Sequence, residues 1–293
     1  MIAIHSITRI AAMFLVLMFS MSIQDELIWK SLIISIGMGH YLIAFWYARN
    51  HLIHVVNQVD LRIPFALLCI GAFLLYWDRF SLVIYFGFHH VFNEVYLLNR
   101  INKNKKVPKL QYFRNSSIFL NIFIYIIVLR NDSELAFIGK GVMYGGLGVS
   151  LALFAYYFME IRKQMKFGEL LDNCIFEVLG FVLIAASFFV EIKFLHVVLY
   201  HFFFWMFYPV PRMLTHGKNV VRNYIGLTLV CTVPFIIASP IGIVSYDLKH
   251  SLFYALFIIG SYVHITLSYA LSDSHPNWIL RIFNPKAALA RST

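Results

Sequence analysis

Long apolar runs recur along the whole chain and constrain its fold more than any other feature. A helix of roughly 17–25 apolar residues crosses the ~30 Å hydrocarbon core of a bilayer. Only helices or closed barrels satisfy every backbone polar group in lipid, and the alternation typical of strands is absent here. We therefore predict an all-α bundle of ten transmembrane helices, forming a single integral membrane domain over residues 1–293. The predicted spans are 8–23, 28–48, 62–77, 80–98, 112–130, 135–159, 173–190, 193–212, 220–243 and 252–272.

The composition excludes an ordinary soluble domain. Hydrophobic residues make up 60% of the chain and charged residues only 13%, whereas soluble domains carry about 25% charged residues. The three cysteines all lie inside apolar runs and lack the CxxC spacing of a zinc site or a disulfide framework. We expect them to be small buried hydrophobic residues. They are Cys69, Cys174 and Cys231.

The net charge of +10 is distributed as in a membrane protein. With the N-terminus inside, alternate loops place 18 Lys and Arg residues on the inner side and 6 on the outer side. An excess of Lys and Arg marks cytoplasmic loops, so we predict that both termini are cytoplasmic. The main basic run, residues 100–114, would lie against anionic lipid headgroups rather than nucleic acid.

Histidines lie at similar depths in four of the predicted spans. These four spans run in the same direction through the membrane, and one further histidine lies one and a half turns from the central level. Several converging neutral imidazoles suit iron, copper or zinc, so we predict a shared metal or cofactor site. For any single histidine, the alternative is a hydrogen-bonded packing role. The candidates are His40, His89, His90, His196, His201 and His264.

Two carboxylates lie within the apolar spans. Glu94 follows His90 by four residues, so both lie on one helix face. It could accept a hydrogen bond from the free ring N–H of a metal-bound histidine, bind the metal directly, or donate a proton in catalysis. Glu177 lies near the inner end of the seventh span, where a structural or a catalytic role is possible. Ionisable groups inside lipid are costly, which makes both of them functional candidates.

Aromatic residues cluster below the predicted histidine level. HFFFWMFYPVP (201–211) and YLIAFWY (41–47) are the densest stretches. Such residues form interfacial belts facing lipid, or they line a tunnel for a long apolar substrate.

Four motifs resemble those of the Brp/Blh family, bacterial and archaeal membrane enzymes that cleave β-carotene into retinal. They are GMGHYLIAF (37–45), HHVFNE (89–94), LHVVLYHFFF (195–204) and YVHITLSYAL (262–271). Three features depart from the family pattern. His196 and His201 are five residues apart rather than four, with no arginine between them. Gly39 stands where the family usually has Pro, and Ala44 stands where it has an acid.

The resemblance implies a non-haem Fe(II) enzyme in a cell membrane, such as a bacterial inner membrane. Iron would be held by His40, His89, His201 and His264, with His90 or His196 as substitutes. The substrate would be a carotenoid or another long apolar molecule, cleaved oxidatively at a double bond. Two other functions remain open: a haem-binding membrane protein, and a transporter or non-catalytic protein with a buried His/Glu proton relay.

Overall fold

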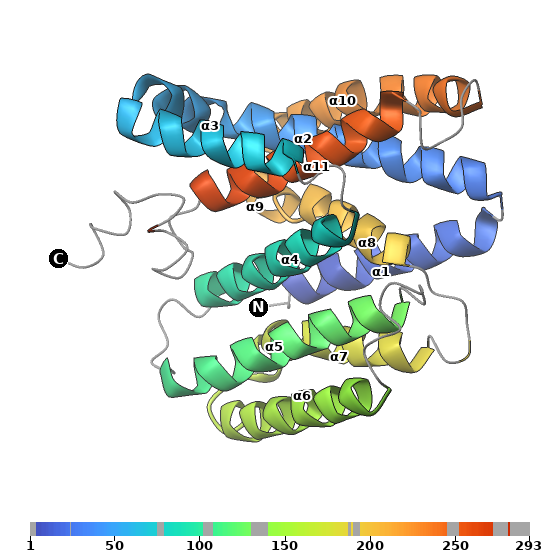
Figure 1. Ribbon diagram of the computed structural model, residues 1–293. Helices are drawn as coiled ribbons and strands as arrows, with labels where there is room; N and C mark the ends of the chain where they lie inside the picture. The colour runs from blue at the N-terminus through green and yellow to red at the C-terminus, as the bar shows by residue number, and fades with distance from the viewer. Residues whose placement is uncertain are drawn as a thin grey trace. The chain divides into compact units, whose positions relative to one another are not determined.

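The computed structural model describes residues 4–23, 25–74, 79–101, 108–129, 140–186, 189, 194–244, 252–271 and 281. Over these residues every regular element is a helix, as predicted (Figure 1). The helices are α1 (Ile4–Ser22), α2 (Glu26–Asn57), α3 (Val59–Leu74), α4 (Arg79–Ile101), α5 (Pro108–Leu129), α6 (Lys140–Ile161), α7 (Phe167–Ala186), α8 (Phe194–Phe207), α9 (Val210–Thr215), α10 (Lys218–Val244) and α11 (Leu252–Leu271).

Each predicted span overlaps a helix, but the eighth span is divided in two. The single helix expected over 193–212 ends as α8 at Phe207, and α9 begins at Val210. Pro209 lies between them with φ −76° and ψ −20°. Proline has no N–H to donate to the preceding turn, which explains why the helix is interrupted here.

Six helical stretches in the described part of the chain are long and apolar enough to cross a membrane, and one of them runs over both α8 and α9. The qualifying stretches are His5–Ser22, Leu27–Asn50, Tyr144–Ile161, Phe194–Thr215, Lys218–Ala238 and Leu252–Tyr269. Among the other helices, α3 has only 16 residues. These apolar helices mark the chain as a membrane protein, whereas ten crossings and the orientation of the termini stay predictions.

The chain divides into two compact units. The first comprises Met1–Met18 and His90–Phe204, and the second comprises Phe19–His89 and Trp205–Thr293. The helices α1, α4 and α8 each continue from one unit into the other. Each unit is described separately below, and the single membrane domain expected from the sequence stays a prediction.

In the first unit, α5 packs against α6 and α7 (Figure 1). Two serines join α5 to α6, because the hydroxyl of Ser117 donates to the carbonyl of Ser150 at 3.2 Å and the reverse bond is 3.1 Å. Gly180 lets α7 approach α5 closely, since a Cβ atom there would lie 2.9 Å from Cγ of Asn121. Small residues at such contacts allow helices to approach closely in membranes.

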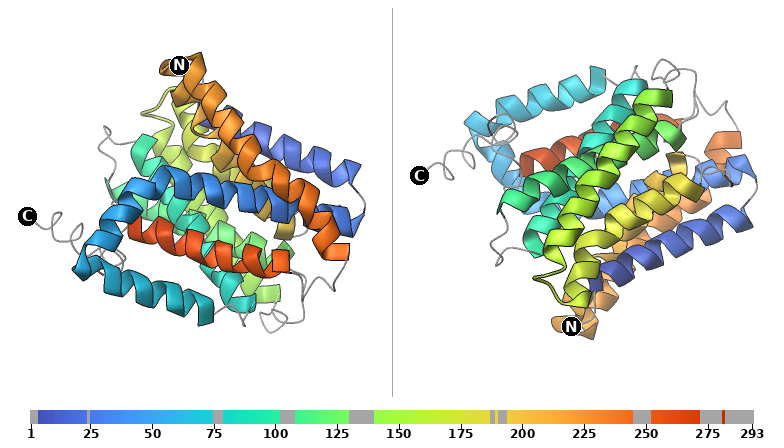
Figure 2. Two further views of the ribbon diagram at one scale, coloured as in Figure 1. Left: turned by 90° about the horizontal axis from the view of Figure 1, so that it is seen from above. Right: turned by 90° about the horizontal axis from the view of Figure 1, so that it is seen from below.

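In the second unit, α2 packs against α3, α10 and α11, and α10 crosses α2 in the left view of Figure 2. The start of α2 is capped by Asp25, whose carboxylate accepts the backbone N–H groups of Leu27 at 2.8 Å and Ile28 at 3.0 Å. Gly39 brings α10 against α2, since a Cβ atom at this position would lie 3.1 Å from Cα of Thr232. Gly39, where the Brp/Blh motif usually has Pro, therefore lies at a helix contact beside His40.

Candidate functional site

In the second unit, α2 and α11 bring two predicted ligands together. The Nε2 atoms of His40 and His264 lie 3.3 Å apart, and their ring centroids are 4.8 Å apart. Two nitrogens bound tetrahedrally to one metal at about 2.0–2.1 Å would be about 3.3 Å apart. The same separation suits a hydrogen bond between a protonated and an unprotonated ring nitrogen. The pair therefore has the spacing of two ligands of one ion.

His89 lies beside this pair, within hydrogen-bond distance of Ser268. Its ring centroid is 5.4 Å from that of His264, and its Nδ1 atom is 2.9 Å from Oγ of Ser268. The hydroxyl of Ser268 donates to the carbonyl of Ile265 at 2.8 Å. When the hydroxyl of Ser268 donates its one proton to Ile265, its oxygen accepts a hydrogen bond from the Nδ1–H of His89. The lone pair of His89 then lies on Nε2, which is the form of imidazole that binds metals.

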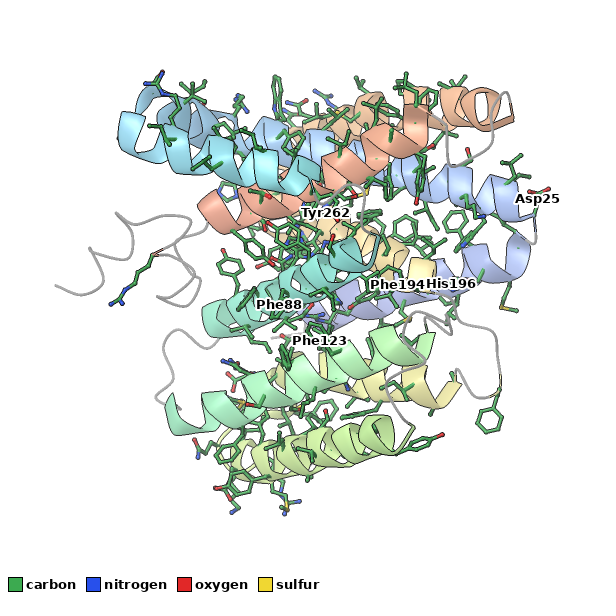
Figure 3. The ribbon with its side chains drawn as sticks, in the orientation of Figure 1. Asp25, Phe88, Phe123, Phe194, His196 and Tyr262 are labelled. Carbon is green, nitrogen blue, oxygen red and sulfur yellow. The ribbon has the colours of Figure 1, made fainter. Side chains whose placement is uncertain are left out.

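Hydroxyl groups hold α11 against α2 and α4 around these histidines. Each pair joins a tyrosine to a small hydroxyl side chain on the facing helix, and Figure 3 marks Tyr262 on α11. Such bonds satisfy buried polar groups and fix the rotation of each helix. The pairs are Tyr41–Ser261 at 2.6 Å, Tyr85–Thr266 at 2.9 Å and Ser81–Tyr262 at 2.7 Å.

In the first unit, α4 and α8 bring His90 and His201 together. Their Nδ1 atoms lie 3.4 Å apart, and the rings meet edge to face with centroids 5.4 Å apart. Both side chains are buried, and the ring of Phe176 lies 5.5 Å from that of His90. The two residues therefore form a second close imidazole pair. The prediction that all the histidines share one metal concerns residues of both units and stays a prediction.

His196 is placed differently from the other candidates. It lies near the start of α8, as Figure 3 shows, and is half-buried. It precedes His201 by five residues, which places the two side chains about 140° apart around the helix. His201, rather than His196, is the histidine of α8 that lies against His90.

Glu94 is bound by an arginine. Its Oε1 atom accepts a hydrogen bond from Nη1 of Arg9 at 3.0 Å, and its Oε2 atom accepts one from Nη2. Nη1 also donates to the hydroxyl of Tyr200 at 3.2 Å. The guanidinium carbon lies 4.5 Å from the ring centroid of Phe204 and 5.1 Å from that of Phe176. Glu94, which was predicted to orient a histidine, bind the metal or donate a proton, therefore neutralises a buried cation.

Sequence reasoning did not find the role of Arg9. It was expected at the inner end of the first span as a topology signal, but its side chain is only 1% exposed, inside the first unit. A partially desolvated guanidinium over aromatic faces gains cation–π attraction in addition to its ion pair. The available signal was its position inside the first predicted span, 8–23, where an arginine requires a partner.

No protein-family model, curated protein or solved structure matches this chain. The resemblance to the Brp/Blh family therefore stays a prediction from four short motifs. A function for the chain has to be argued from the two histidine pairs and the groups that orient them.

Proposed function

We propose that the chain is a membrane-embedded, histidine-ligated non-haem iron protein that oxidises a long apolar substrate. The observation that supports this is the 3.3 Å separation between Nε2 of His40 and Nε2 of His264. Imidazole ligands suit iron, copper or zinc. The resemblance of the histidine motifs to carotenoid-cleaving enzymes favours Fe(II) and a carotenoid or similar substrate.

The chain's own groups would prepare these ligands. His40 and His264 present facing nitrogens, and Ser268 holds His89 with its Nδ1–H engaged. A ligand whose orientation is fixed in advance loses less freedom on binding, and an outer hydrogen bond raises its basicity. Iron, when bound there, would supply the redox chemistry for oxidation by O₂.

We also propose ten membrane crossings with both termini in the cytoplasm of a bacterial cell. Six long apolar helices and the distribution of Lys and Arg support this arrangement. The long apolar substrate would enter from the lipid, in which it dissolves.

Metal analysis of the purified protein tests the proposal. We expect stoichiometric iron in the wild type and a sharp loss of bound iron in His264→Ala, with little change in yield. His216→Ala is the matched control, because His216 is exposed at the end of α9 and should not affect iron. A wild-type protein without metal, even after reconstitution with Fe(II), would contradict the proposal.

A visible spectrum separates this proposal from haem binding. Two axial imidazole nitrogens lie on opposite sides of a haem iron, about 4 Å apart, whereas this pair is separated by 3.3 Å. We expect no intense Soret band. Such a band, lost in His264→Ala, would show that the histidines bind haem.

A further inference from the structure

The first unit contains a buried carboxyl group that forms no ion pair with any residue the structure describes. Glu177 on α7 is fully buried, and neither of its carboxyl oxygens has a hydrogen-bond partner in the described part of the chain. Glu94, in the same unit, is equally buried but has both oxygens bound by Arg9. The negative charge of Glu94 is therefore balanced by an arginine, whereas no such partner contacts Glu177 among the described residues.

The position of Glu177 follows from its neighbours on α7. Asn173, Glu177 and Gly180 have the i, i+4, i+7 spacing of one helix face. Asn173 accepts a hydrogen bond from the hydroxyl of Tyr157 at 3.3 Å, and Gly180 contacts Asn121 of α5. Glu177 thus lies between these two contacts, on the face of α7 that packs inside the unit.

The facing side of α5 carries one charge and one amide. Arg114 is buried, with its guanidinium carbon 5.9 Å from the ring centroid of Tyr157. Asn121 is two turns further along α5, and neither its Oδ1 nor its Nδ2 atom has a partner among the described residues. Along the helix axis, Glu177 therefore lies between the guanidinium of Arg114 and the side-chain amide of Asn121. That amide can still donate and accept hydrogen bonds.

The charged and titratable groups around Glu177 come from five helices. Arg9 and Glu94 neutralise each other through their ion pair. Arg114 adds a further positive charge that acts on Glu177. The groups acting electrostatically on Glu177 or interacting with it are Arg9 of α1, Glu94 of α4, Arg114 of α5, Tyr157 of α6 and Cys174 of α7.

We propose that Glu177 is a proton-binding site inside the membrane, separate from the metal centre. Its carboxyl group carries a proton and is neutral, because an isolated carboxylate is strongly disfavoured in apolar surroundings. When the O–H bond breaks, the proton leaves and the electron pair stays on a carboxylate that Arg114 stabilises. A calcium ion requires six to eight oxygen ligands, and Glu177 and Asn121 offer only three, so calcium does not fit this position.

Infrared difference spectroscopy on the full-length protein in detergent tests this assignment. We expect the C=O stretching band of a protonated carboxylic acid at neutral pH in the wild type and its loss in Glu177→Gln. The band should decrease as the pH is raised and should shift in D₂O. Bound iron should be unchanged in Glu177→Gln, so this test and the metal proposal can fail independently.

Thermal stability of two matched variants provides a second measurement. Glu177→Gln replaces a neutral group by a neutral group of the same shape, so its melting temperature should equal or exceed that of the wild type. Glu94→Gln leaves Arg9 buried without a counter-charge and should lower the melting temperature by several degrees. The proposal is overturned if the band persists in Glu177→Gln, if Glu177→Gln is as unstable as Glu94→Gln, or if Na⁺ stabilises the wild type but not Glu177→Gln.

Discussion

At the scale of single residues, hydroxyl and guanidinium groups decide the chemical state of the candidate site. Ser268 lies within hydrogen-bond distance of both Ile265 and His89, and it accepts from His89 when its own proton goes to Ile265. Arg9 donates a hydrogen bond to each oxygen of Glu94, so the main contact of that carboxylate is with a guanidinium. The sequence did not predict this contact.

Replacing Ser268 should weaken metal binding without unfolding the protein. Ser268→Ala removes the acceptor for the Nδ1–H of His89, and loss of such an outer partner typically costs about 10–100-fold in metal affinity. Ser268→Thr retains the hydroxyl and should rescue binding. The measurement is iron affinity in competition with a chelator.

Ser261→Ala is the control for this prediction. Ser261 lies on the same helix and bonds Tyr41 rather than a histidine. Its loss should leave iron affinity close to that of the wild type. Equal losses in Ser261→Ala and Ser268→Ala would mean that any damage to α11 disturbs the metal, and that Ser268 has no specific role.

At the scale of helices, the close contact of α2 and α10 holds His40 in place. Gly39 immediately precedes this histidine and contacts Thr232 of α10. A helix pair that approaches this closely depends on the absence of a side chain at the contact. The residue next to the candidate ligand is therefore part of the packing that positions it.

Gly39→Ala should destabilise the protein, although alanine is normally the better helix former. The added methyl group would lie 3.1 Å from Cα of Thr232, which is backbone and cannot rotate away. Overpacking of this kind typically costs about 1–3 kcal/mol. Gly148→Ala on α6 is the matched control, because nothing lies within 4 Å of a Cβ atom there, and it should be neutral or stabilising. Melting temperatures of the two variants, if equal, would refute a tight contact at Gly39.

Much of the helical architecture was predictable, because apolar runs long enough to span lipid leave few alternatives. The pairing of His40 with His264 was also expected from their similar depths. The break at Pro209 was missed because the apolar pattern continues through it. The Arg9–Glu94 pair could not be predicted, since 85 residues separate its members and only tertiary packing brings them together.

At the scale of the whole molecule, the distribution of charge supports a defined orientation. Two basic residues that the sequence assigned to the inner side, Arg9 and Arg114, are buried within the first unit. Their removal lowers the inner count from 18 to 16, against 6 on the outer side. The remaining excess of Lys and Arg still predicts cytoplasmic termini.

Reporter fusions test this orientation. A fusion in the 100–111 loop and one at the C-terminus should both report the cytoplasm, and a fusion near Asp132 should report the outside. Residues 102–107 and Asp132 lie outside the described residues, so the test concerns topology alone. Opposite locations for the 100–111 loop and the C-terminus would require an odd number of crossings between them.

The ion pair of Arg9 also affects the order of events during synthesis. The first helix leaves the ribosome with a guanidinium whose counter-charge, Glu94, is translated 85 residues later, and Tyr200 another 106 residues after that. An unpaired arginine in a helix is costly to release into lipid. We therefore expect nascent chains that end before α4 to keep their first helix at the insertion machinery, and chains extended beyond α8 to release it. Release of the first helix into the membrane would then depend on Glu94 and Tyr200, which are translated after it.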